Sequence, residues 1–365
     1  MNSRDRILAA LEGKDMDRIP LLEIGFWPET IERWRNEGFP ESILPEDYFK
    51  LDKITFFSFD GSLQFQEEII EEDEAITIYN NSNGVTYKVF KNRSVSSLFI
   101  ESKIKSLKDW IKYKERLLGS IKRFEEFVKE PIWGKTLIKP QSLRYKESLR
   151  DDTFRVLVPT EPCWYYLRLL GEEEALVAIA SEPDFAEQVI SDYNAFNLTM
   201  IKALYEQGYR FDAVWVFSDL CYKNGMLFSP KFYNEKVELY HKEFFRVCKK
   251  MGMKVIYHCD GYLKEFLPLL IDSGIDCIQP MEVRAGNNVL DYIRLFDSRI
   301  SFMGNINSDI LATNNKEKIF GEISMKVKAK ESGRYLFHSD HSIPPTISFK
   351  SYSYALDIAR ELGRY

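Results

Sequence analysis

Residues 254–280 have the sequence KVIYHCDGYLKEFLPLLIDSGIDCIQP, and this stretch decides the predicted fold. Its opening apolar run, Lys254–Tyr257, predicts a short buried strand, and the apolar positions of Leu263–Asp272 predict a helix that ends at Gly274. The next apolar run, Asp276–Gln279, predicts a second strand. A helix between two short apolar strands is typical of a parallel sheet, because parallel neighbours need a crossover connection.

The same alternation of short strands and helices continues on both sides of this stretch. Further strands are predicted at Arg18–Ile24, Phe154–Val158, Phe211–Phe217, Arg299–Met303 and Tyr335–Phe337. The pattern predicts an α/β fold, a distorted TIM-type (β/α)8 barrel. The alternative is a doubly wound open sheet, which favours a glycine-rich phosphate loop, and the sequence contains neither GxGxxG nor GxxxxGK[ST].

A different pattern occupies approximately residues 50–130, after the first predicted strand. Ile76–Tyr79 and Val85–Phe90 flank the sequence NNSNG at 80–84, which predicts a hairpin because Asn-Gly tolerates positive φ angles. A charged amphipathic helix is predicted at Asp109–Lys129. The whole chain, 1–365, is therefore predicted to be a single barrel domain with a β-hairpin-rich insertion.

The composition excludes several classes of protein. The chain has 365 residues and a formal net charge of −6, so a clustered basic surface for nucleic acid is not expected. No apolar run approaches the roughly 18 residues that span a bilayer, and no secretory signal is evident at the N-terminus. The five cysteines form no CxxC pair, which favours a reducing cytoplasm.

Polar residues gather directly after the predicted strands. In a parallel barrel these strand ends meet at one mouth, which carries the active site. The residues at these positions are Asp219, Tyr222, Asn224, His258, Cys259, Asp260, Glu282, Asn305, Asp340 and His341. Each of them could instead be a hydrogen-bonded structural residue, and Asp219 and Asp260 could cap the helices that follow them.

Two kinds of chemistry suit these residues, and the first is a metal site. Imidazole, thiolate and carboxylate are the usual zinc ligands. The predicted ligands are His258, His341 and Glu282, with either Asp260 or Cys259. Adjacent strand residues point to opposite faces, so Asp260 has the better geometry if His258 faces the pocket.

The second kind of chemistry is acid–base catalysis without a metal. Asp219, Asp260 and Asp340 would act together with the histidines. Several carboxylates in one cleft raise the pKa of one of them, which leaves a proton donor beside an ionised neighbour.

Several motifs together resemble the uroporphyrinogen decarboxylase superfamily. They are RDRILAAL at 4–11, DRIP at 17–20, YKNG at 222–225, SP at 229–230, HCDG at 258–261, PME at 280–282 and DHSIPP at 340–345. The resemblance covers nearly the whole chain except about residues 50–130. It implies a TIM-type barrel, in agreement with the pattern of strands.

True uroporphyrinogen decarboxylases use no metal and carry arginines after the first strand that bind the carboxylates of the substrate. The corresponding stretch here, residues 23–29, is EIGFWPE and contains two glutamates and no arginine. Like charge would repel a substrate rich in carboxylates, which argues against uroporphyrinogen. Phe26 and Trp27 in this stretch, together with Tyr222, are predicted to line a pocket for a flat or apolar substrate.

The second kind of enzyme in this superfamily transfers methyl groups between a corrinoid protein and a thiol such as coenzyme M. These enzymes bind zinc through a His-x-Cys pair and a later cysteine. His258 matches the histidine, whereas Asp260 and His341 stand where the two cysteines would be. The resemblance therefore implies corrinoid-linked methyl transfer with zinc or another divalent metal. The corrinoid would be carried by a partner protein, because an Asp-x-His-x-x-Gly motif is absent.

The leading hypothesis is a metal-assisted methyltransferase. Its predicted catalytic residues are Asp219, His258, Asp260, Asp340 and His341, and its predicted substrate-binding residues are Phe26, Trp27, Tyr222, Asn224, Glu282 and Asn305. The alternatives are a metal-free decarboxylase acting on a porphyrinogen or another carboxylic acid, and a non-catalytic protein that binds a tetrapyrrole or corrinoid. The expected partners are a small substrate and a corrinoid protein, without nucleic acid or membrane, and a homodimer is one expected assembly.

Overall fold

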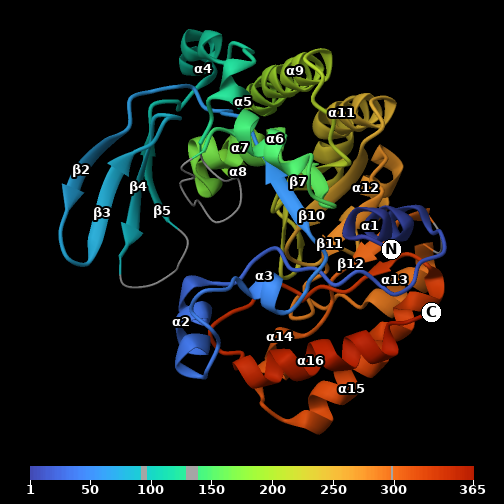
Figure 1. Cartoon of the computed structure of the whole chain (residues 1–365). Helices are drawn as coiled ribbons and strands as arrows, with labels where there is room; N and C mark the ends of the chain where they lie inside the picture. Colours follow the sequence, from blue (N-terminus) through green and yellow to red (C-terminus); the bar gives the residue numbers. More distant parts are fainter. Residues whose placement is uncertain (92–96, 129–138, 297–298) are drawn as a thin grey trace.

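The computed structural model describes residues 1–91, 97–128, 139–296 and 299–365. Its centre is a curled sheet of seven parallel strands with helices outside it (Figure 1). In spatial order the strands are β1 (Ile54–Phe57), β6 (Phe154–Leu157), β7 (Ala213–Phe217), β10 (Lys254–Cys259), β11 (Cys277–Pro280), β12 (Ser301–Met303) and β13 (Tyr335–Leu336). Each strand pairs with the strand of this sheet that follows it in the sequence, as a sheet of the predicted barrel type requires.

The predicted first strand forms isolated bridges instead of a continuous ladder. The N–H of Leu22 donates to the carbonyl oxygen of Phe337 at 3.0 Å, and the N–H of Phe337 donates to that of Pro20 at 2.9 Å. On the other side, the N–H of Asp52 donates to the carbonyl oxygen of Leu21 at 2.8 Å. This segment therefore lies between the end of β13 and the residues just before β1, but Pro20 has no N–H with which to extend a ladder.

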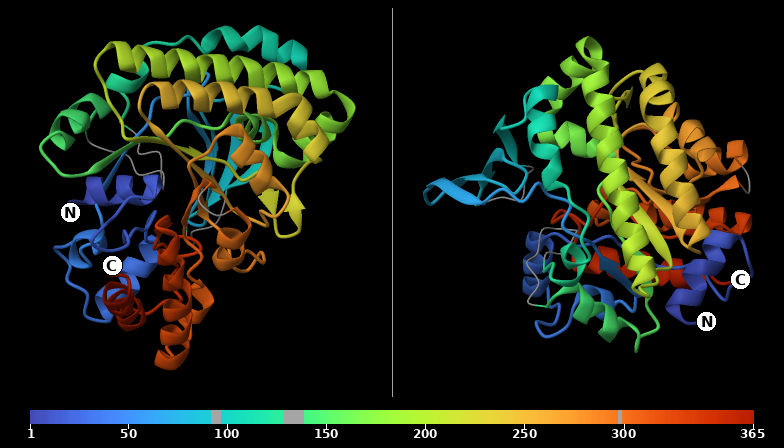
Figure 2. Two further views of the ribbon diagram at one scale, coloured as in Figure 1. Left: turned by 90° about the vertical axis from the view of Figure 1, so that its right-hand side faces the viewer. Right: turned by 90° about the horizontal axis from the view of Figure 1, so that it is seen from above.

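Helices follow most of the strands. The longer ones are α1 (Ser3–Glu12), α2 (Pro28–Asn36), α4 (Leu107–Tyr113), α6 (Gln141–Ser148), α7 (Pro162–Leu170), α8 (Glu172–Ser181), α9 (Pro183–Glu206), α11 (Glu238–Lys250), α12 (Phe266–Ser273), α13 (Val289–Phe296), α15 (Lys316–Lys326) and α16 (Phe349–Leu362). Shorter helices are α3 (Pro45–Tyr48), α5 (Lys122–Glu125), α10 (Pro230–Phe232) and α14 (Ser308–Ala312). Helices α9 and α11 lie side by side (Figure 2).

Strand side chains alternate between two apolar cores, of which one is inside the curled sheet. Ile256 of β10 and Trp215 of β7 belong to this inner core together with Leu11 of α1. The hydroxyl of Ser301, the first residue of β12, also donates to the carbonyl oxygen of Ala10 at 2.9 Å. Helix α1 thus covers the end of the sheet where the strands begin, which leaves the opposite end for a site.

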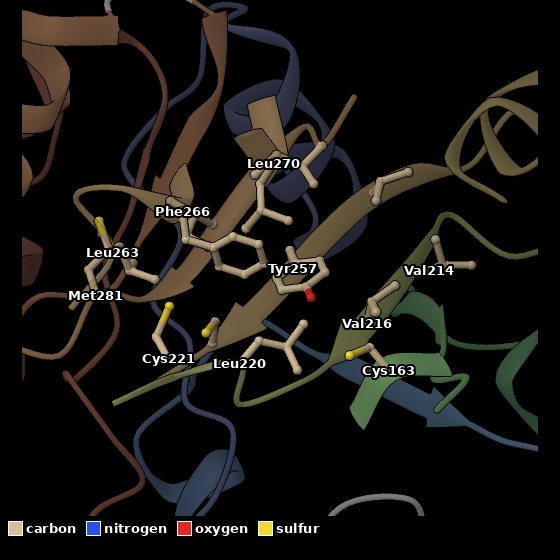
Figure 3. Close-up of a cluster of buried hydrophobic side chains, with 14 of the residues drawn as sticks. Cys163, Val214, Val216, Leu220, Cys221, Tyr257, Leu263, Phe266, Leu270 and Met281 are labelled. Atoms are coloured by element: carbon tan, nitrogen blue, oxygen red, sulfur yellow. The ribbon is translucent and has the colours of Figure 1, made fainter. Parts of the chain in front are cut away.

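The outer core lies between the sheet and the surrounding helices. Figure 3 shows Tyr257 of β10 beside Phe266 and Leu270 of α12, with Val214 and Val216 of β7 on the other side of Tyr257. Because successive side chains of a strand point to opposite faces, the neighbours of Tyr257 on β10 point toward the inside of the sheet.

An antiparallel sheet of four strands lies within the predicted insertion. Its strands are β2 (Glu68–Glu72), β3 (Ile76–Asn80), β4 (Val85–Phe90) and β5 (Leu98–Ser102), and they project from the rest of the molecule (Figure 1). The predicted hairpin joins β3 to β4, with Gly84 at a φ of 72°. Tyr87 of β4 donates its phenol hydrogen to the carbonyl oxygen of Arg168 at 3.0 Å, which attaches this sheet to α7.

Two local features concern helix ends. Asn2 caps α1, and its side chain accepts from the N–H of Asp5. The predicted helix at 109–129 is divided into α4, a 3-10 turn at Lys114–Arg116 and α5, and its end at Lys129 lies outside the described residues. None of the helices in the described part of the chain has the length and apolar character that a bilayer crossing requires.

Candidate functional site

Two neighbouring strands, β7 and β10, bring the central residues of the site together. Phe217 of β7 pairs in register with His258 of β10, and their rings stack with centroids 4.5 Å apart. Because Ile256 faces the inner core, His258, two residues further along, faces the same side. The same alternation directs Cys259 into the outer core.

Four polar side chains meet at the C-terminal ends of these strands. Nε2 of His258 lies 3.5 Å from Oδ1 of Asp219 and 3.9 Å from Oδ1 of Asp260. The N–H of Asp260 donates to Oδ1 of Asp219 at 3.2 Å. Nε2 of His341 lies 3.6 Å from Oδ2 of Asp260. We call Asp219, His258, Asp260 and His341 the mouth cluster.

The charges of the mouth cluster act on one another. Burial alone would lower the pKa of His258, but the neighbouring carboxylates of Asp260 and Asp219 outweigh it and raise the pKa to about 9. Burial alone would raise the pKa of Asp219, but its hydrogen bond to His258 and the charge of His258 lower it. The pKa of Asp260 is raised, chiefly by burial. The cluster therefore favours the presence of a positive charge between its carboxylates.

The mouth cluster fits the ligand chemistry of a divalent cation. One ligand atom from each of Asp219, His258 and Asp260 lies within 4.8 Å of the others. Oδ1 of Asp260 is buried and has no hydrogen-bond partner among the described residues, although buried polar atoms are normally paired. Imidazole nitrogen and carboxylate oxygen are both zinc ligands, so these side chains fit such an ion.

The ligand atoms that lie close together differ in part from the predicted set of metal ligands. Asp219, predicted only as an acid–base residue, stands beside His258, whereas Oε2 of Glu282 accepts from the N–H of Gly261 at 3.0 Å. The thiol of Cys259 is buried and donates to the carbonyl oxygen of Asp260 at 3.2 Å. Burial raises the pKa of Cys259, which disfavours the thiolate that binds metals.

The mouth cluster lines a cavity of about 900 Å³, a size that suits a small organic molecule. The aromatic residues in its wall are Phe59, Phe65, Phe127, Trp164, Tyr165, Tyr193 and Phe217. Arg168 is the one arginine or lysine among the described residues that line the cavity, and its guanidinium lies 3.5 Å from Glu172. The wall therefore combines several aromatic rings with carboxylates and, among its described residues, a single guanidinium.

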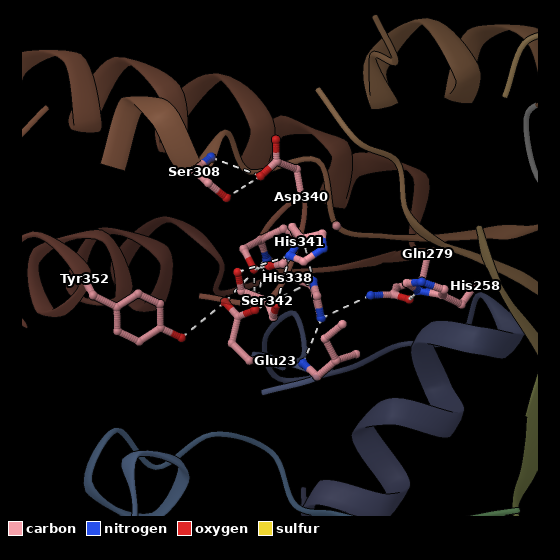
Figure 4. Close-up of polar contacts among 12 residues, drawn as sticks. Glu23, His258, Gln279, Ser308, His338, Asp340, His341, Ser342 and Tyr352 are labelled. Atoms are coloured by element: carbon pink, nitrogen blue, oxygen red, sulfur yellow. Dashed lines mark hydrogen bonds and ion pairs between the residues drawn. The ribbon is translucent and has the colours of Figure 1, made fainter. Parts of the chain in front are cut away.

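Two other residues that were predicted at the mouth make hydrogen bonds within the protein. Asp340 is buried and accepts from the N–H of Ser308 at 3.0 Å and from the hydroxyl of the same residue (Figure 4). Asn305 is fully buried, where its side chain donates to the carbonyl oxygen of Met281 at 2.7 Å and accepts from Lys326. Both residues hold loops at the strand ends in place.

The predicted substrate-binding residues are also dispersed. Phe26 packs against Trp34, with ring centroids 5.4 Å apart, in the outer core. Trp27 donates from Nε1 to the hydroxyl of Ser342 at 2.6 Å, next to the mouth cluster. Tyr222 and Asn224 are exposed at the turn of a two-stranded sheet, β8 (Cys221–Tyr222) and β9 (Gly225–Met226). None of these predicted residues is among the described residues that line the 900 Å³ cavity.

Glu23 and Gln279 have supporting roles that were not predicted from the sequence. Burial raises the pKa of Glu23 to about 8, and the side chain contacts Ser339 and Tyr352. Gln279 is fully buried on β11 and pairs in register with His258. A glutamine inside an otherwise apolar strand is the signal that could have identified it, because a buried amide needs polar partners.

Comparison with known proteins gives a family and a fold. The family model described as "Uroporphyrinogen decarboxylase (URO-D)" matches residues 167–362, which is more than half of the chain. A methyltransferase from Methanosarcina mazei has a similar fold, with a TM-score of 0.63, 15% identity and 99% coverage of both chains. A search of curated proteins finds no match.

Two other solved structures are less similar. A putative vitamin-B12 independent methionine synthase from Listeria monocytogenes has a TM-score of 0.40 and 14% identity, and the match covers 64% of this chain and 72% of that one. A glycerophosphoryl diester phosphodiesterase from Parabacteroides distasonis ATCC 8503 has a TM-score of 0.37 and 12% identity, with coverage of 99% and 93%.

Proposed function

This chain belongs to the uroporphyrinogen decarboxylase family, and on that premise we propose that it is a metal-assisted methyltransferase. It moves a methyl group between a corrinoid on a partner protein and a small acceptor or donor. The observation that carries this proposal is the close approach of ligand atoms from Asp219, His258 and Asp260 in the wall of a 900 Å³ cavity. The structural similarity to a methyltransferase supports the fold on which this proposal depends.

The side chains of the mouth cluster have separate tasks in this proposal. A divalent ion such as zinc would supply Lewis-acid activation of a thiol, alcohol or water. Asp219 and Asp260 provide the negative charge that holds the cation, and His258 provides a nitrogen ligand. His341 has 45% of its side chain exposed, so it can bind a substrate group or move a proton. The aromatic wall packs against the substrate and excludes water.

Metal content tests the first half of the proposal. Protein purified without added metal or chelator is expected to hold about one zinc per chain, and His258→Ala and Asp219→Asn are expected to lose it. The matched control is Asp272→Asn, which removes an exposed carboxylate that pairs with Arg299 at 2.8 Å. Full metal occupancy in His258→Ala would show that the ligand set is wrong.

Turnover tests the second half. Methylcobalamin serves as the corrinoid probe, and a panel of small thiols and alcohols serves as acceptors. The zinc-loaded protein is expected to demethylate the probe, as followed by its absorbance, and His258→Ala is expected to be inactive. Zinc-loaded protein that leaves methylcobalamin unchanged with every acceptor, and with a corrinoid protein as donor, contradicts methyl transfer.

A metal-free decarboxylase is the second candidate function, and one observation favours it. With a pKa of about 9, His258 is an imidazolium at neutral pH and can hold or protonate a carboxylic acid substrate. Arg168 adds a guanidinium to the same cavity. Release of carbon dioxide from porphyrinogens or smaller acids by protein that contains no metal would establish this activity and exclude the first proposal.

A further inference from the structure

A chain of buried hydrogen bonds leads from the backbone of the N-terminal segment to the mouth cluster. The N–H of Ile24 lies 2.9 Å from Nε2 of His338, and the same nitrogen lies 3.3 Å from Nε2 of Gln279. The other end of this amide, Oε1 of Gln279, lies 2.6 Å from Nδ1 of His258. Figure 4 shows the three side chains in line, and His338 and Gln279 are fully buried.

The direction of every bond in this chain follows from its first member. A backbone N–H can only donate, so Nε2 of His338 is an acceptor and carries no hydrogen. The hydrogen of the neutral ring is then on Nδ1, which lies 2.5 Å from the carbonyl oxygen of Ser339. Burial lowers the pKa of His338 to about 3, so this ring stays neutral at physiological pH.

The orientation of the Gln279 amide follows next. A nitrogen without hydrogen accepts from the NH₂ group of Gln279 and would repel its oxygen, so the NH₂ group faces His338. The amide oxygen must therefore face His258, and it accepts a hydrogen from Nδ1 of that ring. With its hydrogen fixed on Nδ1, a neutral His258 has its free electron pair on Nε2.

We propose that Gln279 and His338 are positioning residues that hold the hydrogen of His258 on Nδ1 and direct the Nε2 electron pair at Asp219 and Asp260. This inference rests on the proposed function, in which Nε2 is a metal ligand, and it adds the residues that select the ligand atom. In the protonated ring, Nε2 carries a hydrogen that faces these carboxylates, and a divalent cation would take the place of that hydrogen at the same position. The buried chain therefore prepares the site for a cation, because partners of a ligating histidine fix its tautomer and its orientation.

Two substitutions of Gln279 distinguish the role of its amide oxygen from the role of its NH₂ group. Gln279→Leu removes both the acceptor for His258 and the donor for His338. Gln279→Glu retains an acceptor for Nδ1 of His258 and so serves as the conservative variant. The control is Gln141→Leu, because Gln141 of α6 is equally buried and is absent from the described lining of the cavity.

Zinc affinity, measured by competition with a chromophoric chelator, is the first readout. Gln279→Leu is expected to bind zinc about 10- to 100-fold more weakly than the wild type, whereas Gln279→Glu and Gln141→Leu remain within a few-fold of it. Thermal unfolding confirms that each variant is folded. Equal zinc affinity in the wild type and Gln279→Leu would overturn the inference and leave the proposed function intact.

The second readout is the coordinating atom itself. In protein loaded with cadmium-113 and labelled with ¹⁵N-histidine, the metal is expected to couple to Nε2 of His258, while Nδ1 keeps its hydrogen. Coupling to Nδ1 in the wild type would overturn the inference. If the wild type binds no metal, the proposed function fails, and exchange of the Nδ1 hydrogen of His258 decides the inference. Protection in the wild type and Gln279→Glu but not in Gln279→Leu supports it, and equal exchange in all three overturns it.

Discussion

Replacement of Glu23 by glutamine is expected to remove a large pH dependence from the stability of the fold. The hydroxyl of Ser339 donates to Oε2 of Glu23 at 2.5 Å, and the N–H of Ser339 donates to the same oxygen at 3.3 Å. Glu23 is buried, so its ionised form lacks the solvation that it has in the unfolded chain.

The shift in the pKa of Glu23 determines how strongly the free energy of unfolding depends on pH. Burial raises it from 4.5 to about 8, and the only histidine ring near Glu23 among the described residues, His338, stays neutral. Above pH 4.5 the unfolded chain ionises while the folded chain keeps its proton, so the free energy of unfolding falls until the pH passes about 8. Since one pKa unit corresponds to about 1.4 kcal/mol, this group lowers the free energy of unfolding by about 3 kcal/mol between about pH 5 and pH 8.

Urea unfolding at several pH values tests this reasoning. Glu23→Gln keeps the size of the side chain and an acceptor oxygen for Tyr352, whose phenol oxygen lies 3.2 Å from Oε1, but it does not ionise. The variant is therefore expected to gain stability relative to the wild type as pH rises. Glu32→Gln on the exposed face of α2 is the control and is expected to show no such gain. A difference between wild type and Glu23→Gln that stays constant across this pH range would refute the reasoning.

Three further substitutions test the assignment of the site. Cys259→Ala is expected to keep its zinc and to lose about 1–2 kcal/mol of stability, because the buried thiol packs in the outer core; loss of zinc would return Cys259 to the ligand set. Gly261→Ala is expected to weaken zinc binding and to destabilise the fold by about 1–3 kcal/mol, because φ is +87° and the new Cβ would lie 2.7 Å from the backbone of Tyr222; unchanged zinc affinity would contradict this expectation. Arg168→Gln is expected to raise KM for acidic substrates without changing metal content, and an unchanged KM would show that Arg168 does not bind substrate.

The fold could be predicted where side-chain periodicity and strand order determine it. The alternation along KVIYHC places Ile256 and His258 inside the sheet and Tyr257 and Cys259 outside it, and the structure has this arrangement. The short loops after β7 and β10 bring Asp219 and Asp260 to the same edge because these strands are neighbours. Both inferences need only the sequence, the alternation of side chains along a strand and the rule that parallel strand ends meet.

The remaining parts of the site depend on partners that are distant in the chain. Asp340 follows a strand as Asp219 does, but its carboxylate accepts a hydrogen bond from Ser308, which is 32 residues away. Asn305 is likewise occupied by Lys326 and by a backbone carbonyl. Nothing in the local sequence indicates which polar residue is already paired within the protein. Periodicity also could not locate the break in the helix predicted at 109–129, where Gly119 and Ser120 separate α4 from α5.

The irregular first strand also contributes a contact to the site. Glu23 and Ile24 are consecutive in the N-terminal segment, and His338 and Ser339 are consecutive just after β13. Ile24 contacts His338, and Glu23 contacts Ser339. A regular ladder would satisfy the N–H of Ile24 with a backbone carbonyl, but here it donates to the ring of His338. That bond fixes the tautomer of His338, and through Gln279 it extends to His258. At Ile24 the backbone N–H therefore bonds to a side chain instead of a neighbouring strand, and through His338 and Gln279 this bond orients His258 of the mouth cluster.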